Sequence, residues 1–559
     1  MSTSPRAGLV WDDSNGYLEP KWASEPSIEA IQATCRRVLQ LDAPDGCSVS
    51  FKAEGAFNKV YLVEDNYERR WIFRVSLPID PQKKTVGEVA TLDWLERHSD
   101  IPVPKVIAFD DSGDNEIGYE WTLMDLMPGT SAYRQWRKMS METKTTFVEK
   151  IAEYQAQLFK SQFRTIGTLK DVSLDEDSKS EPGQLVGPMY FMGKRYDLDV
   201  PRGPFRSSYD WLKSFISVIV GDQKRVINEL SESTSDSESS SDSDSSSDSD
   251  SDSDNSSSSD DSSSSDDSSS SDDSSSSDDS SSSDDSSSSD DSSSSDDSSS
   301  SDDSSSSDDS SSSDDSSSSD DSSDSDSPSD DKSDSDADSD SETEAEAKAK
   351  TKEQLVAEYN IGLAEYTIEV AEVLDDILPD IFPKAVNPPE RTVLLHDDLS
   401  LNNILVDDDG AITAIIDWEC VSTVPLWATT KTPQFLVGPE REEAPDRDTY
   451  ADAEPEMEAE ERIRDGDDYL DSEGKNILYW WHLMEYEQTK LRKVYSDRLS
   501  ELCPAWGEAL VDGGLKRDFH EAIFHCTNRR RLVKIDDWVG EIMEGEFPTL
   551  ASIFRPGCT

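Results

Sequence analysis

A run of serine and aspartate interrupts this chain and limits what can fold around it. Between Ser256 and Asp321 the unit SSSSDD repeats eleven times. Residues 231–350 hold 42 acidic and 3 basic residues, and thus 39 of the 70 net negative charges of the 559-residue chain. A segment with almost no apolar side chains cannot bury enough surface to offset the loss of chain entropy, so we expect disorder over 231–350. Folded structure must form from the sequence before and after it.

The sequence on both sides of this tract has a helical pattern: SSYDWLKSFISVIVGDQKRVINEL precedes it and KEQLVAEYNIGLAEYTIEVAEVLDDIL follows it. We therefore interpret the tract as a long insertion between two helices of one domain, which a fold tolerates because the cost of closing a loop grows slowly with length. Two roles stay open for it. The tract is either a solvated tether or a target of acid-directed protein kinases, and its charge also suits basic protein partners.

The overall composition excludes several classes of partner. An acidic surface lacks the Lys and Arg that neutralise phosphate backbones, so we expect neither nucleic acid nor an anionic membrane as a partner. The six cysteines are scattered without a CxxC pair, which indicates a reducing compartment and no zinc module. The N-terminal stretch MSTSPRAGLVWDDSNG has no apolar core of signal-peptide length, and the longest apolar run, near WLKSFISVIVG, is about half as long as a membrane span requires. These features predict a cytoplasmic protein.

The folded parts are predicted to form an α+β, two-lobed structure. Residues 49–77 show two or three strands, with turns at Glu54–Gly55 and Asp65–Asn66. A helix around TVGEVATLDWLERH follows, then strand-like text at IPVPKVIAFD and YEWTLMDLMPG; beyond Pro128 the pattern is mainly helical. The expected domains are a helical N-terminal extension (1–48), a β-rich lobe (49–127), two parts of a helical lobe (128–230 and 351–430) around the insertion, and an acidic linker with a helical C-terminal region (431–559).

One stretch, VLLHDDLSLNNILVDDDGAITAIIDWE at 393–419, concentrates chemistry between two strand-like runs. His396, Asp398 and Asn403 stand in the arrangement H-x-D-x-x-x-x-N, and a predicted hairpin with an acidic turn leads to Asp417. The ordinary alternative is a loop and a strand end with chance acids. The combined pattern resembles the catalytic loop of kinase-like phosphotransferases, most closely the aminoglycoside phosphotransferase family and its fungal relatives. The resemblance covers roughly residues 50–430 without the insertion.

This resemblance implies a protein-kinase-like fold that transfers the γ-phosphate of ATP to a hydroxyl group. Asp398 would orient the attacking hydroxyl and accept its proton. Asn403 and Asp417 would supply oxygen ligands to Mg²⁺. His396 would brace the loop, and the acids at 407–409 would form a solvated turn.

The resemblance also implies where the nucleotide binds. Gly55 and Asn58, in KAEGAFNKVYLV, resemble the turn that covers the phosphates of ATP. Arg74 stands where the family has a phosphate-pairing lysine, and Glu88 stands where a helix glutamate pairs with that lysine. Backbone groups of Asp125 to Met127 would meet the adenine edge. Arg for Lys is a departure, because a guanidinium fork and a compact ammonium differ in geometry.

Further differences from the kinase motifs indicate which kind of substrate to expect, and they leave a second function open. Protein kinases usually have Lys at the place of Ser400, and neither DFG nor APE follows here, so a small-molecule hydroxyl substrate is favoured over a protein. HDDLSLNN replaces the commoner HGDLHPGN, so an antibiotic substrate does not follow from the family name. The competing hypothesis is a kinase-like scaffold without catalytic activity, in which Arg74 is the inactivating residue and the Ser/Asp tract binds partners.

Overall fold

The computed structural model describes seven segments of the chain, all within one compact unit: residues 6–14, 18–41, 46–171, 180–239, 352–384, 386–452 and 475–554. The disorder expected over 231–350 lies outside the described residues from 240 onwards. It is wrong for 231–239, which form the end of helix α6 (Ser208–Ser239).

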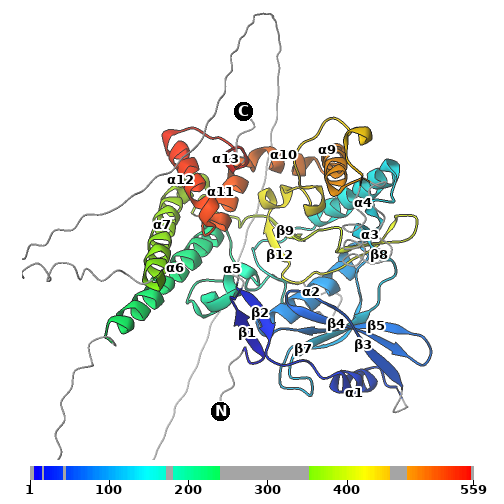
Figure 1. Cartoon of the computed structure of the whole chain (residues 1–559). Coiled ribbons are helices and arrows are strands. Elements are labelled where there is room, and N and C mark those ends of the chain that lie inside the picture. Colours follow the sequence, from blue (N-terminus) through cyan, green and yellow to red (C-terminus); the bar gives the residue numbers. More distant parts are fainter. Residues whose placement is uncertain are drawn as a thin grey trace, which may run out of the picture. The chain divides into compact units, whose positions relative to one another are not determined.

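The β-rich lobe is a five-stranded antiparallel sheet with the strand order β3-β4-β5-β7-β6 (Figure 1). Its strands are β3 (Cys47–Glu54), β4 (Asn58–Asp65), β5 (Arg70–Ser76), β6 (Val106–Asp110) and β7 (Glu120–Asp125). Two or three strands were predicted within 49–77; the structure has three, separated by the two predicted turns. Phe73 and Leu123 are fully buried at the centre of this sheet, where β-branched and aromatic side chains pack well.

Helix α2 (Lys83–His98) connects the sheet to the larger lobe. Its side chains Trp94 and Leu95 belong to the hydrophobic core that α4 (Met141–Lys160) and α9 (Ile477–Leu502) also form. The helix predicted around 85–98 is therefore confirmed, and it is buried on most sides. A helix that packs in this way can place polar side chains at the junction of the lobes.

The N-terminal region contains more than the helix expected for it. Helix α1 (Ile28–Val38) begins at Ser27, whose side chain accepts a hydrogen bond from the Ala30 N–H, and it packs on the sheet. Before it, β1 (Leu9–Asp12) and β2 (Glu19–Trp22) pair as an antiparallel hairpin, and Trp22 lies edge-on against Tyr119 at 4.9 Å between ring centroids. The expectation of a purely helical extension differs from the structure at this hairpin.

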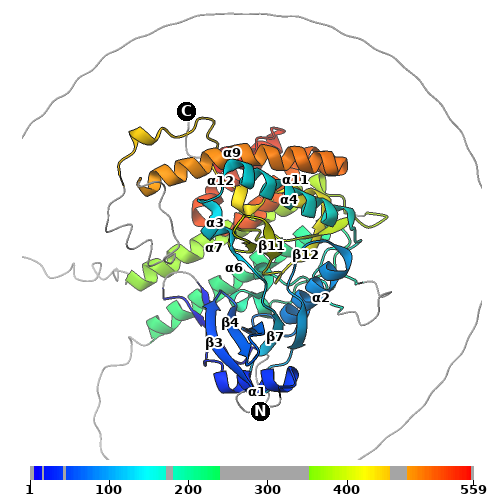
Figure 2. The ribbon, with the colours of Figure 1, turned by 90° about the vertical axis from the view of Figure 1, so that its right-hand side faces the viewer.

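The helical lobe is organised around two helix pairs. Helices α4 and α9 pack against each other, as do α6 (Ser208–Ser239) and α7 (Lys352–Ile381) (Figures 1 and 2). The two helices that flank the Ser/Asp tract in sequence are thus neighbours in one compact unit, where the sequence predicted two helices of one domain. The shorter helices are α3 (Ala132–Trp136), α5 (Pro188–Phe191), α10 (Pro504–Asp512), α11 (Gly514–His525), α12 (Arg529–Glu544), α13 (Leu550–Phe554), and the 3₁₀ turns η1 (Gly193–Asp197), η2 (Leu426–Thr430), η3 (Gln434–Leu436) and η4 (Arg447–Thr449).

Strands return in this lobe. The hairpin of β10 (Ile404–Val406) and β11 (Ile412–Ile415) pairs with β8 (Thr130–Ser131), and β9 (Thr392–Leu395) pairs with β12 (Ser422–Pro425). Strands β9, β10 and β11 lie within the range 393–416 where strands were predicted, give or take one residue, whereas β8 and β12 were not predicted. The α+β prediction is confirmed: an N-terminal antiparallel sheet precedes a mainly helical part in a two-lobed, kinase-like arrangement. None of the helices in the described ranges combines the length and apolar character that crossing a bilayer requires.

Candidate active site

The β10–β11 hairpin brings its two flanking loops together. The N–H of Ile416, just after β11, donates to the carbonyl of Asn403, just before β10, at 2.9 Å. The side-chain amide nitrogen of Asn403 donates to Asp398 twice, to its Oδ2 and to its backbone carbonyl, each at 2.9 Å. Partial burial raises the pKa of Asp398, and the hydrogen bond from Asn403 opposes that rise. The predicted pair of Asp398 and Asn403 is thus in direct contact.

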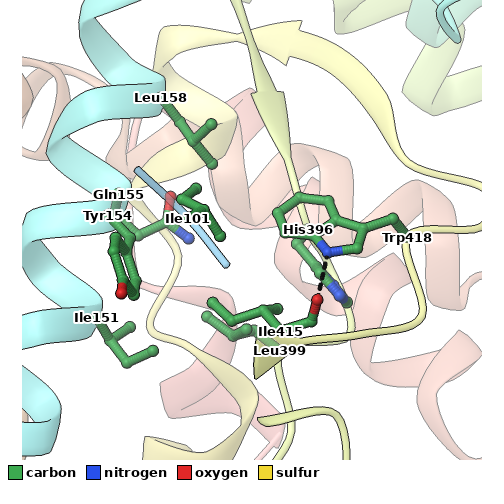
Figure 3. A pocket seen from close by; sticks show the side chains of 9 residues that line it. All are labelled: Ile101, Ile151, Tyr154, Gln155, Leu158, His396, Leu399, Ile415 and Trp418. Atoms are coloured by element: carbon green, nitrogen blue, oxygen red, sulfur yellow. Dashed lines mark hydrogen bonds between the residues drawn. The ribbon is translucent and has the colours of Figure 1, made fainter. Parts of the chain in front are cut away.

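His396 lies beneath this loop, away from solvent. Its Nε2 donates to the carbonyl of Ile416 at 3.1 Å, and its ring packs edge-on against Trp418 at 4.6 Å between centroids. The indole of Trp418 in turn donates to the carbonyl of Ile415 at 2.9 Å, and apolar side chains of α4 close the other side (Figure 3). Burial lowers the pKa of His396, so the ring is neutral at pH 7. These contacts suit the bracing role expected of this histidine.

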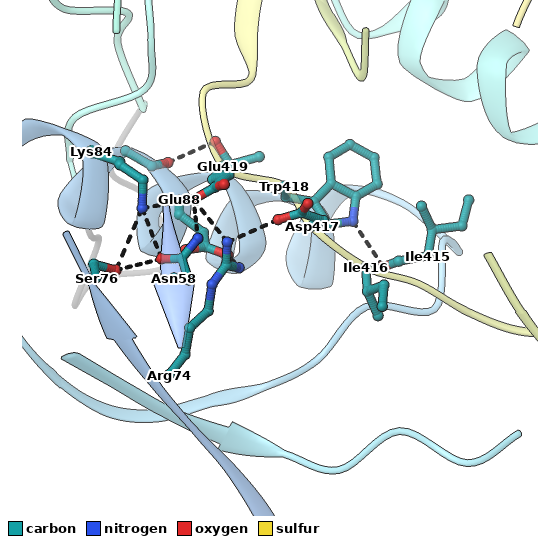
Figure 4. A network of polar contacts seen from close by, with 12 residues as sticks. Asn58, Arg74, Ser76, Lys84, Glu88, Ile415, Ile416, Asp417, Trp418 and Glu419 are labelled. Atoms are coloured by element: carbon teal, nitrogen blue, oxygen red, sulfur yellow. Dashed lines mark hydrogen bonds and ion pairs between the residues drawn. The ribbon is translucent and has the colours of Figure 1, made fainter. Parts of the chain in front are cut away.

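A buried ion cluster lies where the two lobes meet (Figure 4). Arg74 of β5 pairs through Nη1 with Glu88 of α2. Its Nη2 lies 2.8 Å from Asp417 Oδ1 and 2.8 Å from Glu419 Oε2, both on the segment after β11. Burial works against the charged guanidinium, but the three carboxylates outweigh burial and raise the pKa of Arg74 above its ordinary value. Burial also raises the pKa of Glu88 despite its arginine neighbour.

Two members of the cluster, Lys84 and Glu419, were missed at the sequence level. Lys84 Nζ lies 2.6 Å from Glu419 Oε2, 2.9 Å from Asn58 Oδ1 and 3.4 Å from Ser76 Oγ. Burial opposes ionisation of Glu419, but Lys84 and Arg74 lower its pKa to about 2. The available signal was spacing: Lys84 precedes Glu88 by four residues, which places both on one face of a helix.

The glycine turn and the linker lie at the edges of the sheet. The Gly55 N–H donates to the carbonyl of Asn58 at 2.9 Å, which closes the turn between β3 and β4, and Gly55 itself is exposed. The amide of Asn58 points into the ion cluster and donates to Glu419 at 2.7 Å. In the linker, Asp125 ends β7 and is exposed, whereas Met127 is half-buried. Asn58 therefore connects the turn to the acids of the other lobe.

The side chains at the lobe junction offer the donor chemistry of a magnesium site. Asn403 uses its amide nitrogen for Asp398, which leaves its amide oxygen for a cation. The Asp417 side chain is 37% exposed, and its backbone is held in the left-handed region at a φ of 65°. No group of three or more His, Cys, Asp or Glu in the described residues is placed to hold a metal ion. These donors fit Mg²⁺, which commonly completes its coordination with substrate phosphates and water.

Comparison with known proteins finds one family model and several fungal relatives that match parts of this chain. The family model described as "Phosphotransferase enzyme family" (APH) matches residues 49–172 and 323–428. A subtelomeric hrmA-associated cluster protein of Aspergillus fumigatus is 30% identical over 165 residues, which covers 28% of this chain and 32% of that protein. The mitochondrial "Altered inheritance of mitochondria protein 9" of Meyerozyma guilliermondii is 26% identical over 186 residues, or 31% of this chain and 29% of that protein. The chain therefore matches about a third of the length of these relatives.

Two solved structures give similar alignments. A putative aminoglycoside phosphotransferase from Ralstonia eutropha JMP134 aligns at a TM-score of 0.36 and 12% identity, covering 95% of this chain and 97% of that one. ADP-bound aminoglycoside phosphotransferase APH(2'')-Ib aligns at a TM-score of 0.34 and 10% identity, covering 94% and 98%. The family model carries the assignment, because its matched segments contain the sheet, α2 and the β10–β11 hairpin. This chain belongs to the phosphotransferase enzyme family.

Proposed function

We propose that the chain transfers the γ-phosphate of ATP to a hydroxyl group of a small molecule with the help of Mg²⁺. The observation that carries this proposal is the arrangement around the β10–β11 hairpin. Asp398 and Asn403 contact each other, and Ile416, the residue before Asp417, donates its N–H to the carbonyl of Asn403. Asp417 in turn reaches the cations of the β-rich lobe.

Asp398 is proposed to orient the acceptor hydroxyl and to take its proton. Its carboxylate is exposed, so a substrate has access, and Asn403 holds one of its oxygens in place. A carboxylate that is fixed by one oxygen keeps the other for the hydroxyl proton. His396 is neutral and buried, so it supports the loop rather than competing for that proton.

Asn403 and Asp417 are proposed to hold Mg²⁺, which when bound supplies positive charge that offsets the charge of the phosphates. Gly55 is proposed to let the turn approach the phosphates closely, because it carries no side chain. Arg74, paired with Glu88, holds Asp417 from the opposite lobe. Backbone groups from Asp125 to Met127 are proposed to contact the adenine.

The acceptor is proposed to be a small molecule in the cytoplasm. The place of the protein-kinase lysine is taken by Ser400, which lies on the loop beside Asp398 and donates its N–H to the carbonyl of that residue at 2.9 Å. The acidic balance of the chain favours approach of cationic compounds, which concerns the rate of encounter and not the identity of the acceptor.

The test is a calorimetric titration of ATP with and without Mg²⁺, followed by a screen of hydroxyl compounds for ADP formation. Asp398→Ala should bind ATP as the wild type does and transfer no phosphate. Transfer by the Asp398→Ala variant at the wild-type rate would refute the assigned role.

A catalytically silent scaffold is the second candidate, and one observation favours it. Arg74 holds the proposed metal ligand Asp417 and two further carboxylates in one closed cluster. Absence of ATP binding both with and without Mg²⁺ would support the scaffold and contradict the transferase. Partners of the Ser/Asp tract, either basic proteins or an acid-directed kinase, would then carry the function.

A further inference from the structure

The ion cluster contains two buried cations whose surroundings differ. Arg74 faces three carboxylates, those of Glu88, Asp417 and Glu419. Lys84 pairs with one carboxylate, and its other two contacts are the neutral oxygens of Asn58 and Ser76 (Figure 4). The side chain of Lys84 is only 2% exposed. Its charge is therefore balanced by a single partner.

This difference decides which cation can exchange a partner for a phosphate oxygen. If Arg74 moved to a phosphate, the buried carboxylate of Glu88 would lose its ion pair, which is costly in a low-dielectric interior. If Lys84 turned to a phosphate, Glu419 would keep Arg74 at 2.8 Å and the Asn58 amide at 2.7 Å. The exchange at Lys84 leaves no carboxylate of the cluster unpaired.

The position of Lys84 also suits an anion. Its Nζ lies between Asn58, which begins β4 just after the glycine turn, and Glu419, two residues beyond Asp417. The first turn of α2 carries Lys83 and Lys84 and no acidic residue. The helix dipole disfavours cations there, and a bound anion would relieve that repulsion.

We propose that Lys84, and not Arg74, is the side chain that contacts the phosphates of ATP, while Arg74 positions the carboxylates around it. The inference rests on the proposed function, because it needs ATP between the glycine turn and Asp417. It also gives Arg74 a reason to differ from the family's lysine. A planar guanidinium with five donors can hold three carboxylates, whereas an ammonium group suits a phosphate as a compact charge.

A lysine-directed acyl-phosphate derivative of ATP tests the contact on the intact wild-type chain. The Lys84 amine would attack the acyl carbon, an amide bond would form, the bond from that carbon to the phosphate oxygen would break, and ATP and a proton would leave. A guanidinium does not react in this way. Peptide mapping should place the label on Lys84, and excess MgATP should prevent it. Labelling at Lys83 or Lys59 instead, or no labelled lysine although the probe binds, would overturn the proposal.

Substitutions separate a phosphate contact from a merely structural role. Lys84→Met should weaken ATP binding by about tenfold or more, the value of a lost charge-assisted hydrogen bond, and should change adenosine binding by less than about twofold. Lys83→Arg is the matched control, because Lys83 lies on the same turn and an arginine keeps its ion pair with the buried Asp80, 3.6 Å away; this variant should bind both ligands as the wild type does. Equal losses for ATP and adenosine in Lys84→Met would show a structural role and overturn the inference.

Failure of the two proposals can be told apart. If the wild type binds no ATP in the presence of Mg²⁺, the proposed function fails and the inference fails with it. If the wild type binds ATP and Lys84→Met binds it equally well, only the inference fails. The labelling experiment uses the wild type, so it decides the question even where Lys84→Met does not fold.

Discussion

Two glycines near the proposed nucleotide site, Gly129 and Gly55, should respond differently to alanine substitution: we expect the first to be needed for stability and the second for ATP binding. Gly129 follows the linker and has a φ of +101°, a conformation that residues with a side chain rarely adopt. A Cβ added there would lie 2.5 Å from Thr413 Oγ1 and 2.5 Å from the carbonyl oxygen of Val406. Gly55 has neither problem, because the nearest atom to its Cβ would be the Asn58 carbonyl oxygen at 4.0 Å.

The expected cost of Gly129→Ala is large. The backbone conformation contributes about 1–3 kcal/mol. The overlap with β10 and β11 adds about 1–3 kcal/mol, because one of the two neighbours is a backbone carbonyl that can shift only with its strand. We therefore expect Gly129→Ala to lower the free energy of unfolding by about 2–6 kcal/mol. Gly55→Ala should change it by less than about 0.5 kcal/mol, as at an ordinary surface position.

Urea unfolding of the two variants, together with ATP titration of the folded proteins, measures both effects. Gly55→Ala should unfold with the wild type and still bind ATP more weakly, because an added methyl group keeps the turn from approaching the phosphates. Wild-type stability of Gly129→Ala would refute the steric reasoning. Wild-type ATP affinity of Gly55→Ala would refute the phosphate-covering role of the turn.

Four further variants probe charged side chains of the core and of the lobe junction. Lys144→Ala should lower the free energy of unfolding in urea by about 3–5 kcal/mol, because it leaves the buried carboxylate of Glu487, 2.6 Å away on α9, without an ion pair. The double variant Lys144→Met with Glu487→Leu should come within about 1–2 kcal/mol of the wild type. Equal losses in both variants would contradict this reasoning. In the folded state the pKa of Glu419 is lowered from 4.5 to about 2, so its contribution to stability is present above about pH 4.5 and is lost as the pH falls towards 2. The difference in unfolding free energy between the wild type and Glu419→Gln should therefore shrink between pH 4.5 and 2. A constant difference over this range would contradict the lowered pKa. Asp417→Ala should remove the Mg²⁺ dependence of ATP binding in calorimetry, and retained dependence would exclude Asp417 as a ligand.

The fold was predictable where local pattern and burial agree. The apolar run VYLV within residues 58–65 and the turn residues on each side of it identify β4 and its neighbours, and the acidic turn with Gly410 identifies the β10–β11 hairpin. The hairpin at 9–22 was not predicted, because each strand has four residues and β2 contains Pro20, which weakens the strand signal.

The site was predictable only in part, because it forms between lobes. The motif in the loop identifies Asp398 and Asn403, since both lie within six residues of each other. Lys84 and Glu419 belong to segments 335 residues apart in the chain, and nothing local shows that the first turn of α2 faces the end of β11. Their contact depends on the packing of α2 into the core of the helical lobe, which is a tertiary property.

Arg74 shows why contacts that depend on tertiary packing matter for predicting function. By the resemblance stated from the sequence, Arg74 takes the place of a phosphate-pairing lysine, and the scaffold hypothesis interprets this as inactivating. In the structure the guanidinium of Arg74 pairs with Glu88 through Nη1 and with Asp417 and Glu419 of the opposite lobe through Nη2. A single ammonium group reaches three carboxylates less readily. The lysine charge is not lost from the cluster, because Lys84 brings it from the helix one turn before Glu88. The arginine that the resemblance alone would interpret as inactivating therefore lies in the same buried cluster as a lysine, Lys84.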